Sequence, residues 1–275
     1  MKKLKSFEKI IIFSGAFIWL LVSIFPLYNL MSVTFSSDNS DITRTFFPNS
    51  FSNGISKIRL AFIHVDILKG TLDSTLITSF TILGMLIICS LAAYEFAFYQ
   101  FPLKKILFAA IMSSMMLPMV LYIVPLYRFT VNVGLSDTIS GVSLPLMVRA
   151  LSVFILLQFL ESMPLSLIES ARIDGAGHFR IFFSIVLPLM RNAIITVTVL
   201  MFISVWGSYL WPSLVTSANI RPMSVVIASL LNPNFWIDER VKIAAMLVSS
   251  IVPLAIYLGF QKYIIDGIAA SGIKG

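Results

Sequence analysis

Charged residues are scarce in this chain of 275 residues, at 12%, whereas hydrophobic residues make up 58%. A soluble globular protein has about a quarter of its residues charged and about half apolar. The mean hydropathy of the chain is +0.93. This composition excludes an ordinary soluble domain and indicates a membrane protein.

Residues that commonly build catalytic and metal sites are also few. The chain has one cysteine, Cys89, which allows no internal disulfide, and two histidines, His64 and His178. The topology derived below places these histidines on opposite sides of the membrane, and no His-Glu-x-x-His helix is present, so we expect no shared metal. Ser152 and Ser204 lie in apolar runs, where a serine more often bonds backbone or a neighbouring helix than acts as a nucleophile. We therefore expect no enzyme activity and no metal site.

The sequence also lacks a Gly-x-x-x-x-Gly-Lys-Ser/Thr loop, the device that cradles nucleotide phosphates. We expect no cofactor in this chain, and any ATP that drives it must be bound by another subunit. Strand-like alternation over the roughly 10-residue segments of a membrane barrel is missing, and backbone groups in lipid then require helices. The predicted fold class is all-α and polytopic.

Six apolar stretches are long enough to cross a hydrocarbon layer of about 30 Å at about 1.5 Å per residue. Most are uncharged, but the second carries Glu95 near its end and the fourth carries Arg149. No further domain is visible in the connecting segments. We predict one transmembrane domain over residues 1–275, with helices at 10–31, 76–99, 106–127, 139–160, 193–214 and 243–260.

Lysine and arginine in the connecting segments set the orientation, because cytoplasmic segments carry an excess of them. One side is denser in these cations and is assigned to the cytoplasm; it carries Lys2, Lys3, Lys5, Lys9, Lys104, Lys105, Arg172, Arg180, Arg191, Lys262 and Lys274. Both termini and the polar insert at residues 161–192 then face the cytoplasm. The same bias explains the net charge of +7, so no nucleic-acid partner is implied.

Two segments leave alternatives open. The lysines before the first apolar run fit a secretory signal peptide, but the run is long and no small-residue cleavage pattern follows Pro26, which favours an uncleaved first helix. The segment 32–75 is punctuated by Pro48, Asn49, Gly54 and Gly70. It is either a lid of short helices on the outer face or a flexible connector.

The polar insert (residues 161–192) has a readable local pattern. Pro164 ends the preceding helix, and Ser166 with Glu169 three residues later predicts a capping box that starts a short helix. Gly175 can close that helix in a left-handed conformation, and an amphipathic piece then leads to Pro188. Small residues around the turn would let another backbone approach closely. The pattern predicts a helical hairpin that docks a partner; the alternative is a hairpin lying on lipid headgroups.

The insert resembles the EAA signature of binding-protein-dependent ABC transporter permeases of the carbohydrate uptake branch. The match runs over Glu169, Ser170, Ala171, Arg172, Ile173, Asp174, Gly175 and Ala176, then Phe182, Ile185, Leu187, Pro188 and Leu189. It extends over most of the chain, through Ala93, Tyr94, Phe101, Pro102, Pro118, Pro125, Leu126, Tyr127, Gly134, Leu135, Asp137, Thr138, Phe154, Gln158, Phe159, Trp206, Pro212, Pro253, Gln261 and 272–275. In pattern it is similar to the second permease subunits of maltose-type and glycerol-phosphate-type importers.

The resemblance implies a bacterial or archaeal cell-membrane protein that forms a heterodimer with a sister permease subunit. It further implies two ATPase subunits, which bind the ATP and Mg, and an extracellular substrate-binding protein. The polar insert becomes the coupling helix that seats in the ATPase, and the resemblance assigns this role to Glu169, Ser170, Ala171, Asp174, Gly175, Ala176, Leu187 and Pro188. The expected function is half of the translocation pathway of a carbohydrate importer.

The chain departs from the family pattern at several positions. Serine stands at Ser170 where alanine is usual, and Asn192 replaces a proline. Gly207 and Ser208 replace an asparagine and an acid, so no substrate contact is carried over to them.

Candidate pathway residues are Arg149, Trp206, Tyr209 and Trp211. The three aromatic residues either stack on sugar rings or form the usual interfacial belt. A mid-membrane charge costs at least roughly 2.5 to 3.5 kcal/mol on insertion scales. Arg149 therefore either binds an anionic group such as a phosphate or uronate, or pairs with an acid of the sister subunit.

Other function classes are less well supported. A secondary transporter needs paired intramembrane acids or broken inverted repeats, whereas Glu95 is the only acid within a predicted helix. An importer of another solute, such as a glycerol-phosphate ester, is the alternative within the ABC class. The sequence does not identify the cargo, because much of that choice lies in the partner subunits.

Overall fold

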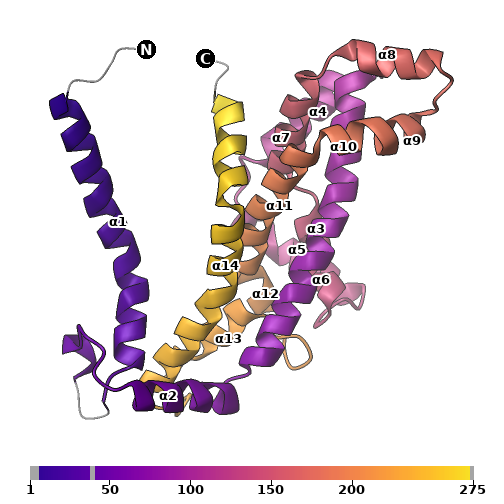
Figure 1. The fold of residues 1–275 in the computed structure, drawn as a ribbon. Helices are drawn as coiled ribbons and strands as arrows, with labels where there is room; N and C mark the ends of the chain where they lie inside the picture. The colour runs from indigo at the N-terminus through magenta and orange to yellow at the C-terminus, as the bar shows by residue number, and fades with distance from the viewer. Residues whose placement is uncertain (1–5, 38–40, 273–275) are drawn as a thin grey trace. The chain divides into compact units, whose positions relative to one another are not determined.

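The computed structural model describes residues 6–37 and 41–272, and within these ranges every regular element is helical (Figure 1). The elements are α1 Ser6–Thr34, η1 Ile42–Arg44, α2 Phe51–His64, α3 Ile67–Phe98, α4 Lys104–Ser114, η2 Met119–Leu121, α5 Ile123–Asn132, α6 Ile139–Met147, α7 Ala150–Glu161, α8 Leu165–Ile173, α9 His178–Ile181, η3 Phe182–Val186, α10 Leu187–Leu189, α11 Arg191–Trp206, α12 Leu210–Val215, α13 Met223–Ser229 and α14 Glu239–Gly272. The all-α prediction is confirmed. The cations Lys2, Lys3, Lys5 and Lys274 and the match at 273–275 lie outside the described residues.

The chain divides into two compact units, one within residues 1–68 and 226–251, the other within 69–225 and 252–275. In the first unit, α2 packs against the end of α1 where the rings of Phe35 and Phe51 stack 5.4 Å apart. A Cβ on Gly54 would lie 2.1 Å from the Phe35 ring, so only glycine permits this approach. Lys57 donates a hydrogen bond to the carbonyl of Ser36. The segment 32–75 thus contains short packed helices, which favours the first of its two interpretations.

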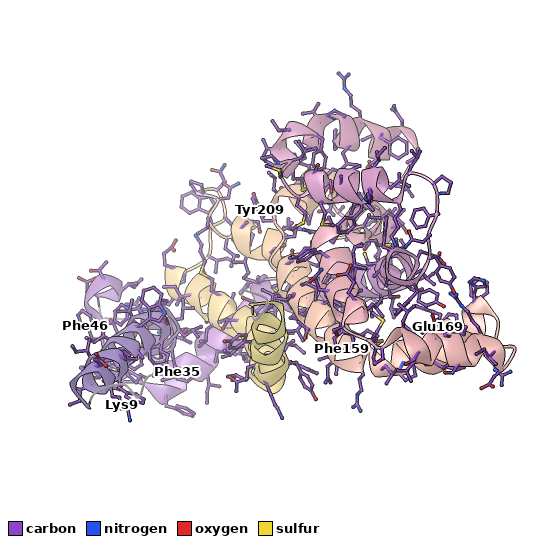
Figure 2. The ribbon with its side chains drawn as sticks, turned by 90° about the horizontal axis from the view of Figure 1, so that it is seen from above. Lys9, Phe35, Phe46, Phe159, Glu169 and Tyr209 are labelled. Carbon is purple, nitrogen blue, oxygen red and sulfur yellow. The ribbon has the colours of Figure 1, made fainter. Side chains whose placement is uncertain are left out.

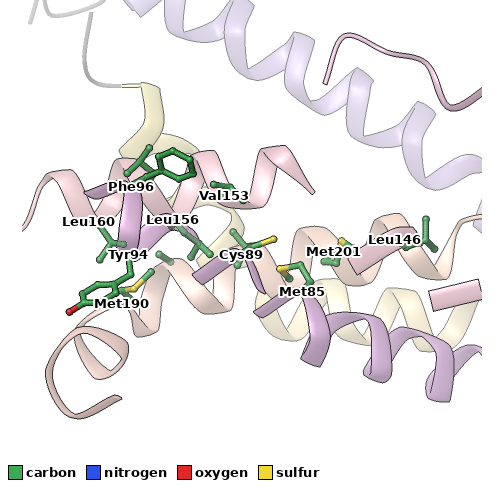
Figure 3. Packing of buried hydrophobic residues seen from close by; sticks show 14 of the residues in the cluster. Met85, Cys89, Tyr94, Phe96, Leu146, Val153, Leu156, Leu160, Met190 and Met201 are labelled. Carbon is green, nitrogen blue, oxygen red and sulfur yellow. The ribbon is translucent and has the colours of Figure 1, made fainter. Parts of the chain in front are cut away.

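The second unit holds the main hydrophobic core, to which α3, α6, α7, α11 and α12 contribute. Figure 3 shows this cluster extending from Tyr94 and Leu160 to Leu146. A Cβ on Gly84 would lie 2.3 Å from the sulfur of Met147, so this glycine lets α3 approach the end of α6 closely. Because buried apolar side chains join these five helices, the second unit offers a rigid base for the polar insert.

Three described helices are long and apolar enough to cross a membrane, at Glu8–Thr34, Ile67–Phe98 and Glu239–Tyr263. Two bent pairs raise the number to five if each pair forms one span: α6 with α7 at 46°, and residues 178–189 with α11 at 76°. These helices are consistent with the predicted polytopic membrane class, whereas the count of six helices stays a prediction.

Three of the six predicted spans are interrupted rather than continuous. The stretch 106–127 is divided into α4, η2 and α5 at a turn that ends with Pro118, a residue that disfavours helix in the residue before it. The stretch 139–160 breaks between α6 and α7, and 193–214 breaks between α11 and α12 after Gly207. Non-helical backbone at membrane depth is tolerated only where protein or water surrounds it. If these stretches lie at membrane depth, their non-helical backbone requires protein or water around it, and at the break between α6 and α7 the Cys89 thiol of α3 supplies one such contact.

Candidate functional site

The polar insert begins with α8, which starts at Leu165 directly after Pro164. Proline has no N–H to leave unsatisfied at a helix start, and its carbonyl here accepts from the N–H of Leu167 at 3.2 Å. The predicted capping box of Ser166 with Glu169 is wrong, because α8 starts before Ser166 and has no side-chain cap. The Glu169 carboxylate is exposed and has no partner among the described residues (Figure 2).

The end of α8 is a Schellman turn centred on Gly175. Gly175 has a φ of +76°, and its N–H donates to the carbonyl of Arg172 at 3.0 Å. The N–H of Ala176 donates to the carbonyl of Ala171, also at 3.0 Å. These two bonds satisfy carbonyls that the helix end leaves free, and the left-handed backbone favours glycine. The predicted left-handed closure at Gly175 is confirmed.

The chain returns through α9, the π-helical turn η3 and α10. π-Helical turns are rare and occur frequently at functional sites. α11 then follows at 76° to this returning segment. In Figure 1 the insert, labelled α8, α9 and α10, extends from one end of the second unit. The backbone of the insert therefore has the predicted order of a helix, a turn and a second helical piece.

One face of the insert is fixed to the core and the other is exposed. Ile168, Ala171, Ile181 and Phe182 are buried and belong to the core cluster. On either side of the turn, Ile173 is 86% exposed and Phe179 is 73% exposed. Exposed apolar side chains of this size on a rigid base are typical of a protein or membrane contact.

The resemblance-derived coupling residues divide between these faces. Glu169, Ser170, Asp174, Gly175 and Pro188 are exposed, Ala176 and Leu187 are half-buried, and Ala171 is buried. Ser170 bonds back to the carbonyl of Leu167 at 3.1 Å, so its hydroxyl is satisfied within α8. Four of the exposed members, Glu169, Ser170, Asp174 and Gly175, lie in the second half of α8 or in the turn that ends it, whereas Pro188 lies in α10.

Tyr99, directly after α3, receives contacts from the insert that the sequence did not reveal. The guanidinium of Arg172 lies 4.8 Å from the centroid of the Tyr99 ring, and the ring of His178 stacks on it with centroids 4.8 Å apart. The Tyr99 hydroxyl is 2.9 Å from the hydroxyl of Tyr94, whose ring contacts Phe182. Tyr94 was part of the family match, but nothing in the sequence pattern paired these residues.

Arg149 lies at the break between α6 and α7, with an extended backbone at φ −124° and ψ 112°. The Cys89 thiol donates weakly toward the carbonyls of Met147 and Arg149, at 3.7 and 3.8 Å, which helps to satisfy carbonyls at the break. The Arg149 side chain is half-buried, and its guanidinium has no hydrogen-bond or ion-pair partner among the described residues. The charge is therefore available to a ligand or to another subunit.

The three aromatic candidates do not form one cluster. Trp211 is fully buried, and its indole N–H donates to the carbonyl of Val142 at 3.2 Å, which ties α12 to α6. Trp206 is buried and stacks on Phe202 at 5.2 Å. Tyr209 is 50% exposed. Only Tyr209 is open to a solute in this conformation.

Asp137 holds a loop that lies far away in sequence, between α12 and α13. Its carboxylate accepts hydrogen bonds from the N–H and hydroxyl of Ser217, at 2.8 and 2.7 Å, and from the N–H groups of Asn219 and Ile220, at 2.9 and 3.1 Å. Burial alone would raise the pKa of the Asp137 carboxyl, but these bonds outweigh burial and hold the pKa well below its ordinary value. Asp137 thus remains an anion and fixes this loop.

The same loop is bound by the beginning of α3. The Asp73 carboxylate accepts from the N–H of Arg221 at 2.8 Å, and the Ser74 hydroxyl accepts from the N–H of Met223 at 2.7 Å. Lys69 donates to the carbonyl of Ala218 at 2.9 Å. We refer to residues 216–223 as the 216–223 loop; its backbone is fixed by side chains from two distant segments.

Within the described ranges, no group of three or more His, Cys, Asp or Glu side chains is arranged to hold a metal ion. The second unit presents exposed apolar side chains at the tip of the polar insert, Ile173 and Phe179, and a half-buried arginine, Arg149, at a helix break.

Comparison with known proteins gives a consistent result. Residues 84–269 match the family described as "Binding-protein-dependent transport system inner membrane component". The chain is 36% identical over 196 residues, 68% of each chain, to the sn-glycerol-3-phosphate transport system permease protein UgpE of Yersinia enterocolitica. It is 32% identical over 268 residues to UgpE of Rhizobium meliloti, covering 91% of this chain and 92% of the other.

A further relative is the arabinooligosaccharides transport system permease protein AraQ of Bacillus subtilis. It is 33% identical over 208 residues, which are 75% of this chain and 74% of AraQ. The fold is similar to a chain in the crystal structure of a bacterial ABC transporter involved in the import of the acidic polysaccharide alginate. That match has a TM-score of 0.81 at 22% identity and covers 96% of this chain and 99% of the other.

Proposed function

The chain belongs to the family of inner membrane components of binding-protein-dependent transport systems, and on that premise we propose that it couples ATP hydrolysis elsewhere to solute import through the polar insert. A component of such a system is a membrane transport subunit and not itself an enzyme. The observation that carries the proposal is the two-sided insert: Ile168 and Phe182 are buried in the core, whereas Ile173 and Phe179 are exposed beside the Gly175 turn.

This arrangement suits mechanical coupling. The Schellman turn makes the tip of the insert rigid, and the buried face joins it to the helices of the second unit. When the ATPase subunits close on ATP, a tip seated in a cleft of the ATPase moves with it. The buried face would pass that movement to the helices and switch access to the pathway from one side to the other. In this scheme the exposed Glu169 pairs with a cation of the ATPase, because it makes no bond within α8.

The partners proposed are a sister permease subunit, two ATPase subunits that bind ATP and Mg, and an extracellular substrate-binding protein. The six predicted apolar stretches would then form six crossings, with interrupted ones facing the sister subunit or the pathway. The polar insert and both termini are assigned to the cytoplasmic side, in keeping with the excess of lysine and arginine there.

The proposed cargo is a carbohydrate or a closely related polyol. Support comes from the similarity to a permease for arabinooligosaccharides and from the exposed Tyr209, whose ring is suited to stacking on a sugar. Trp211 is assigned a structural role instead, because it is fully buried and bonded to Val142. Trp206 is buried too, so it would reach a sugar only in another conformation.

A glycerol-phosphate ester is the second candidate cargo, and one observation favours it. Arg149 presents an unpaired guanidinium at a helix break, and arginine binds phosphate through paired N–H groups. The relatives named UgpE are permeases for sn-glycerol-3-phosphate. A carboxylate of the sister subunit is the alternative partner for Arg149.

Docking through the insert is tested by Gly175→Asp, which places a side chain and a charge at the left-handed turn. We expect loss of ATPase co-purification and of transport, with normal insertion into the membrane. Gly134→Asp is the matched control, because Gly134 also has a positive φ, +73°, and open space around it but lies outside the insert. Normal co-purification of the ATPase with Gly175→Asp would overturn the proposal.

The cargo is tested by ATPase activity of the purified complex with its binding protein, across neutral sugars and sugar phosphates. Stimulation by a neutral sugar supports the first candidate, and stimulation by phosphate esters alone supports the second. For an anionic cargo, Arg149→Ala should raise the KM for transport and Arg149→Lys should restore it in part. If Arg149→Ala instead separates the permease subunits, the acid of the sister subunit is the partner.

A further inference from the structure

The polar insert touches two aromatic residues, one in α3 and one directly after it, and the second is contacted from both sides of the Gly175 turn. Arg172 stands before the Gly175 turn and His178 after it, and both reach the same ring, Tyr99, at 4.8 Å. Further along the returning segment, the ring of Phe182 lies 5.3 Å from that of Tyr94. The two ends of the turn are thus joined to one side chain.

Tyr99 is in turn fixed to α3. Its hydroxyl lies 2.9 Å from that of Tyr94 and the two rings are 5.4 Å apart in an edge contact. Lys104 donates to the Tyr99 carbonyl at 2.8 Å. Arg172 and His178 are exposed, whereas Tyr94 is 2% exposed and part of the core. Tyr99 therefore connects exposed side chains of the insert to a buried side chain of α3.

α3 itself is suited to carrying a displacement. It is one helix of 32 residues without an internal proline. At its other end, Asp73 and Ser74 bind backbone N–H groups of the 216–223 loop. From Asp73 to Tyr94 the helix rises about 30 Å, at about 1.5 Å per residue. The same helix is thus bonded to the insert at one end and to the 216–223 loop at the other (Figure 1).

We propose that Tyr99 is the positioning residue through which the polar insert moves α3, and that α3 transmits this movement to the 216–223 loop. A pull or rotation of the tip acts on the Tyr99 ring from both sides of the turn, so the ring follows the tip. Because Tyr99 is bonded to Tyr94, α3 moves with it, and Asp73 and Ser74 carry the loop along. The inference rests on the proposed function only in taking ATPase closure as the source of the movement.

The experiment measures a change in the 216–223 loop, which is bonded to the start of α3. The chain has one cysteine, Cys89, which is buried, so Cys89→Ser with Asn219→Cys gives a single reporter in the loop. Asn219 is exposed and contributes only its backbone N–H to Asp137. In the purified complex, the rate of maleimide labelling at residue 219 is measured without nucleotide and after trapping with ATP and vanadate.

We expect the labelling rate of the reporter protein to change on trapping, and Tyr99→Leu to abolish that change while ATPase still co-purifies and hydrolyses ATP. Tyr99→Phe loses the hydroxyl contact with Tyr94 but keeps the ring that meets Arg172 and His178 and the edge contact of that ring with Tyr94, so it should retain most of the response. Tyr127→Leu is the control, because it makes the same change in α5, outside both α3 and the insert. A merely structural role for Tyr99 would lower complex yield without removing the response to nucleotide.

A second variant tests the same contacts in case Tyr99→Leu does not fold. Arg172→Gln with His178→Ala removes the same contacts from the insert, where both side chains are exposed, and should abolish the response equally. The inference is overturned if the labelling rate of this double variant changes on trapping as it does in the parent. It is also overturned if the labelling rate of the parent is the same with and without nucleotide. Failure of the proposed function is recognised separately, because Gly175→Asp would then leave ATPase co-purification intact.

Discussion

The two segments bonded to the ends of α3 are held in physically different ways. The polar insert is held by apolar and aromatic contacts: Phe182 packs on Tyr94, and Arg172 and His178 lie against Tyr99. The 216–223 loop is held by directional hydrogen bonds to carboxylates, four of them to Asp137 and one to Asp73. Ring contacts hold two elements together in more than one relative orientation, whereas a carboxylate that accepts several N–H groups fixes one backbone conformation.

This difference fits opposite mechanical tasks. An element that seats in a moving partner must shift without breaking its connection, and stacked rings allow that. A loop that is to move as a unit must keep its own shape, and bonds to Asp137 provide this. The comparison predicts that substitutions at the insert chiefly change coupling and packing, and that substitutions at the loop chiefly change local order.

The largest effect is expected from removing the buried side chain that ties the insert to the core. Phe182 is 3% exposed and touches Tyr94 and Phe183. Phe182→Ala should lower the free energy of unfolding by roughly 3 to 5 kcal/mol, since buried Phe→Ala changes remove burial and leave a cavity. Thermal unfolding of the purified complex measures this loss. Phe179→Ala, at a ring that is 73% exposed, is the control and should leave the midpoint nearly unchanged.

Local patterns in the sequence predicted the insert well and its long-range contacts poorly. The Gly175 turn follows from a glycine just after an amphipathic stretch, a signal contained in a few residues. The predicted start of α8 was wrong. Ser166 matched a capping pattern, but the helix begins at Leu165, with Pro164 at the N-cap. The helix starts directly after Pro164, whose extended backbone precedes it, and not after the serine two residues further on.

The connections of Asp137 and Arg149 had no local signal. Asp137 bonds residues that lie 80 to 83 positions away, and no periodicity links such segments. The helix break falls at Val148 and Arg149, neither of which is a typical helix-breaking residue. The nearest proline, Pro145, lies inside α6. The Cys89 thiol of α3 donates toward the carbonyls of Met147 and Arg149. Tertiary packing decided both features, so a single sequence could predict the apolar stretches but not where they are interrupted.

An intermediate effect is expected at Asp137. Asp137→Asn keeps a residue that tolerates the positive φ of +56°. It replaces one carboxylate oxygen by an NH2 group, which would face the groups of Ser217 and Asn219 that donate to Asp137. Because the site is largely open to solvent, we expect a loss of roughly 2 kcal/mol rather than the sum of four charged bonds. Limited proteolysis at the 216–223 loop should become faster, whereas cleavage elsewhere should not. Equal cleavage rates at the loop would contradict the assigned role.

The pH dependence of the same bond network sharpens this prediction. The folded pKa of Asp137 is depressed, so its contribution is present above the unfolded carboxyl pKa and is lost only as pH falls through the folded pKa. Protease resistance of the loop should therefore be unchanged between neutral pH and about pH 4.5, a range above the ordinary aspartate pKa. In the Asp137→Asn protein, residue 137 should cause no loss of protease resistance at low pH, because an asparagine side chain does not titrate. Loss of protection in the parent near pH 5 would show that another group controls the loop.

The smallest effect separates backbone strain at the insert from its docking role. Gly175→Ala adds a methyl group at φ +76°, where the space is open but an L residue is strained by roughly 1 to 2 kcal/mol. Gly177→Ala, two residues on, has ordinary φ and equally open space, so it should be neutral or slightly stabilising. Thermal unfolding of the two variants measures the difference, and ATPase co-purification should survive in both, because neither adds charge or bulk to the turn. If Gly175→Ala already releases the ATPase while its unfolding midpoint matches that of Gly177→Ala, the turn acts through contact with the partner and not through its backbone geometry.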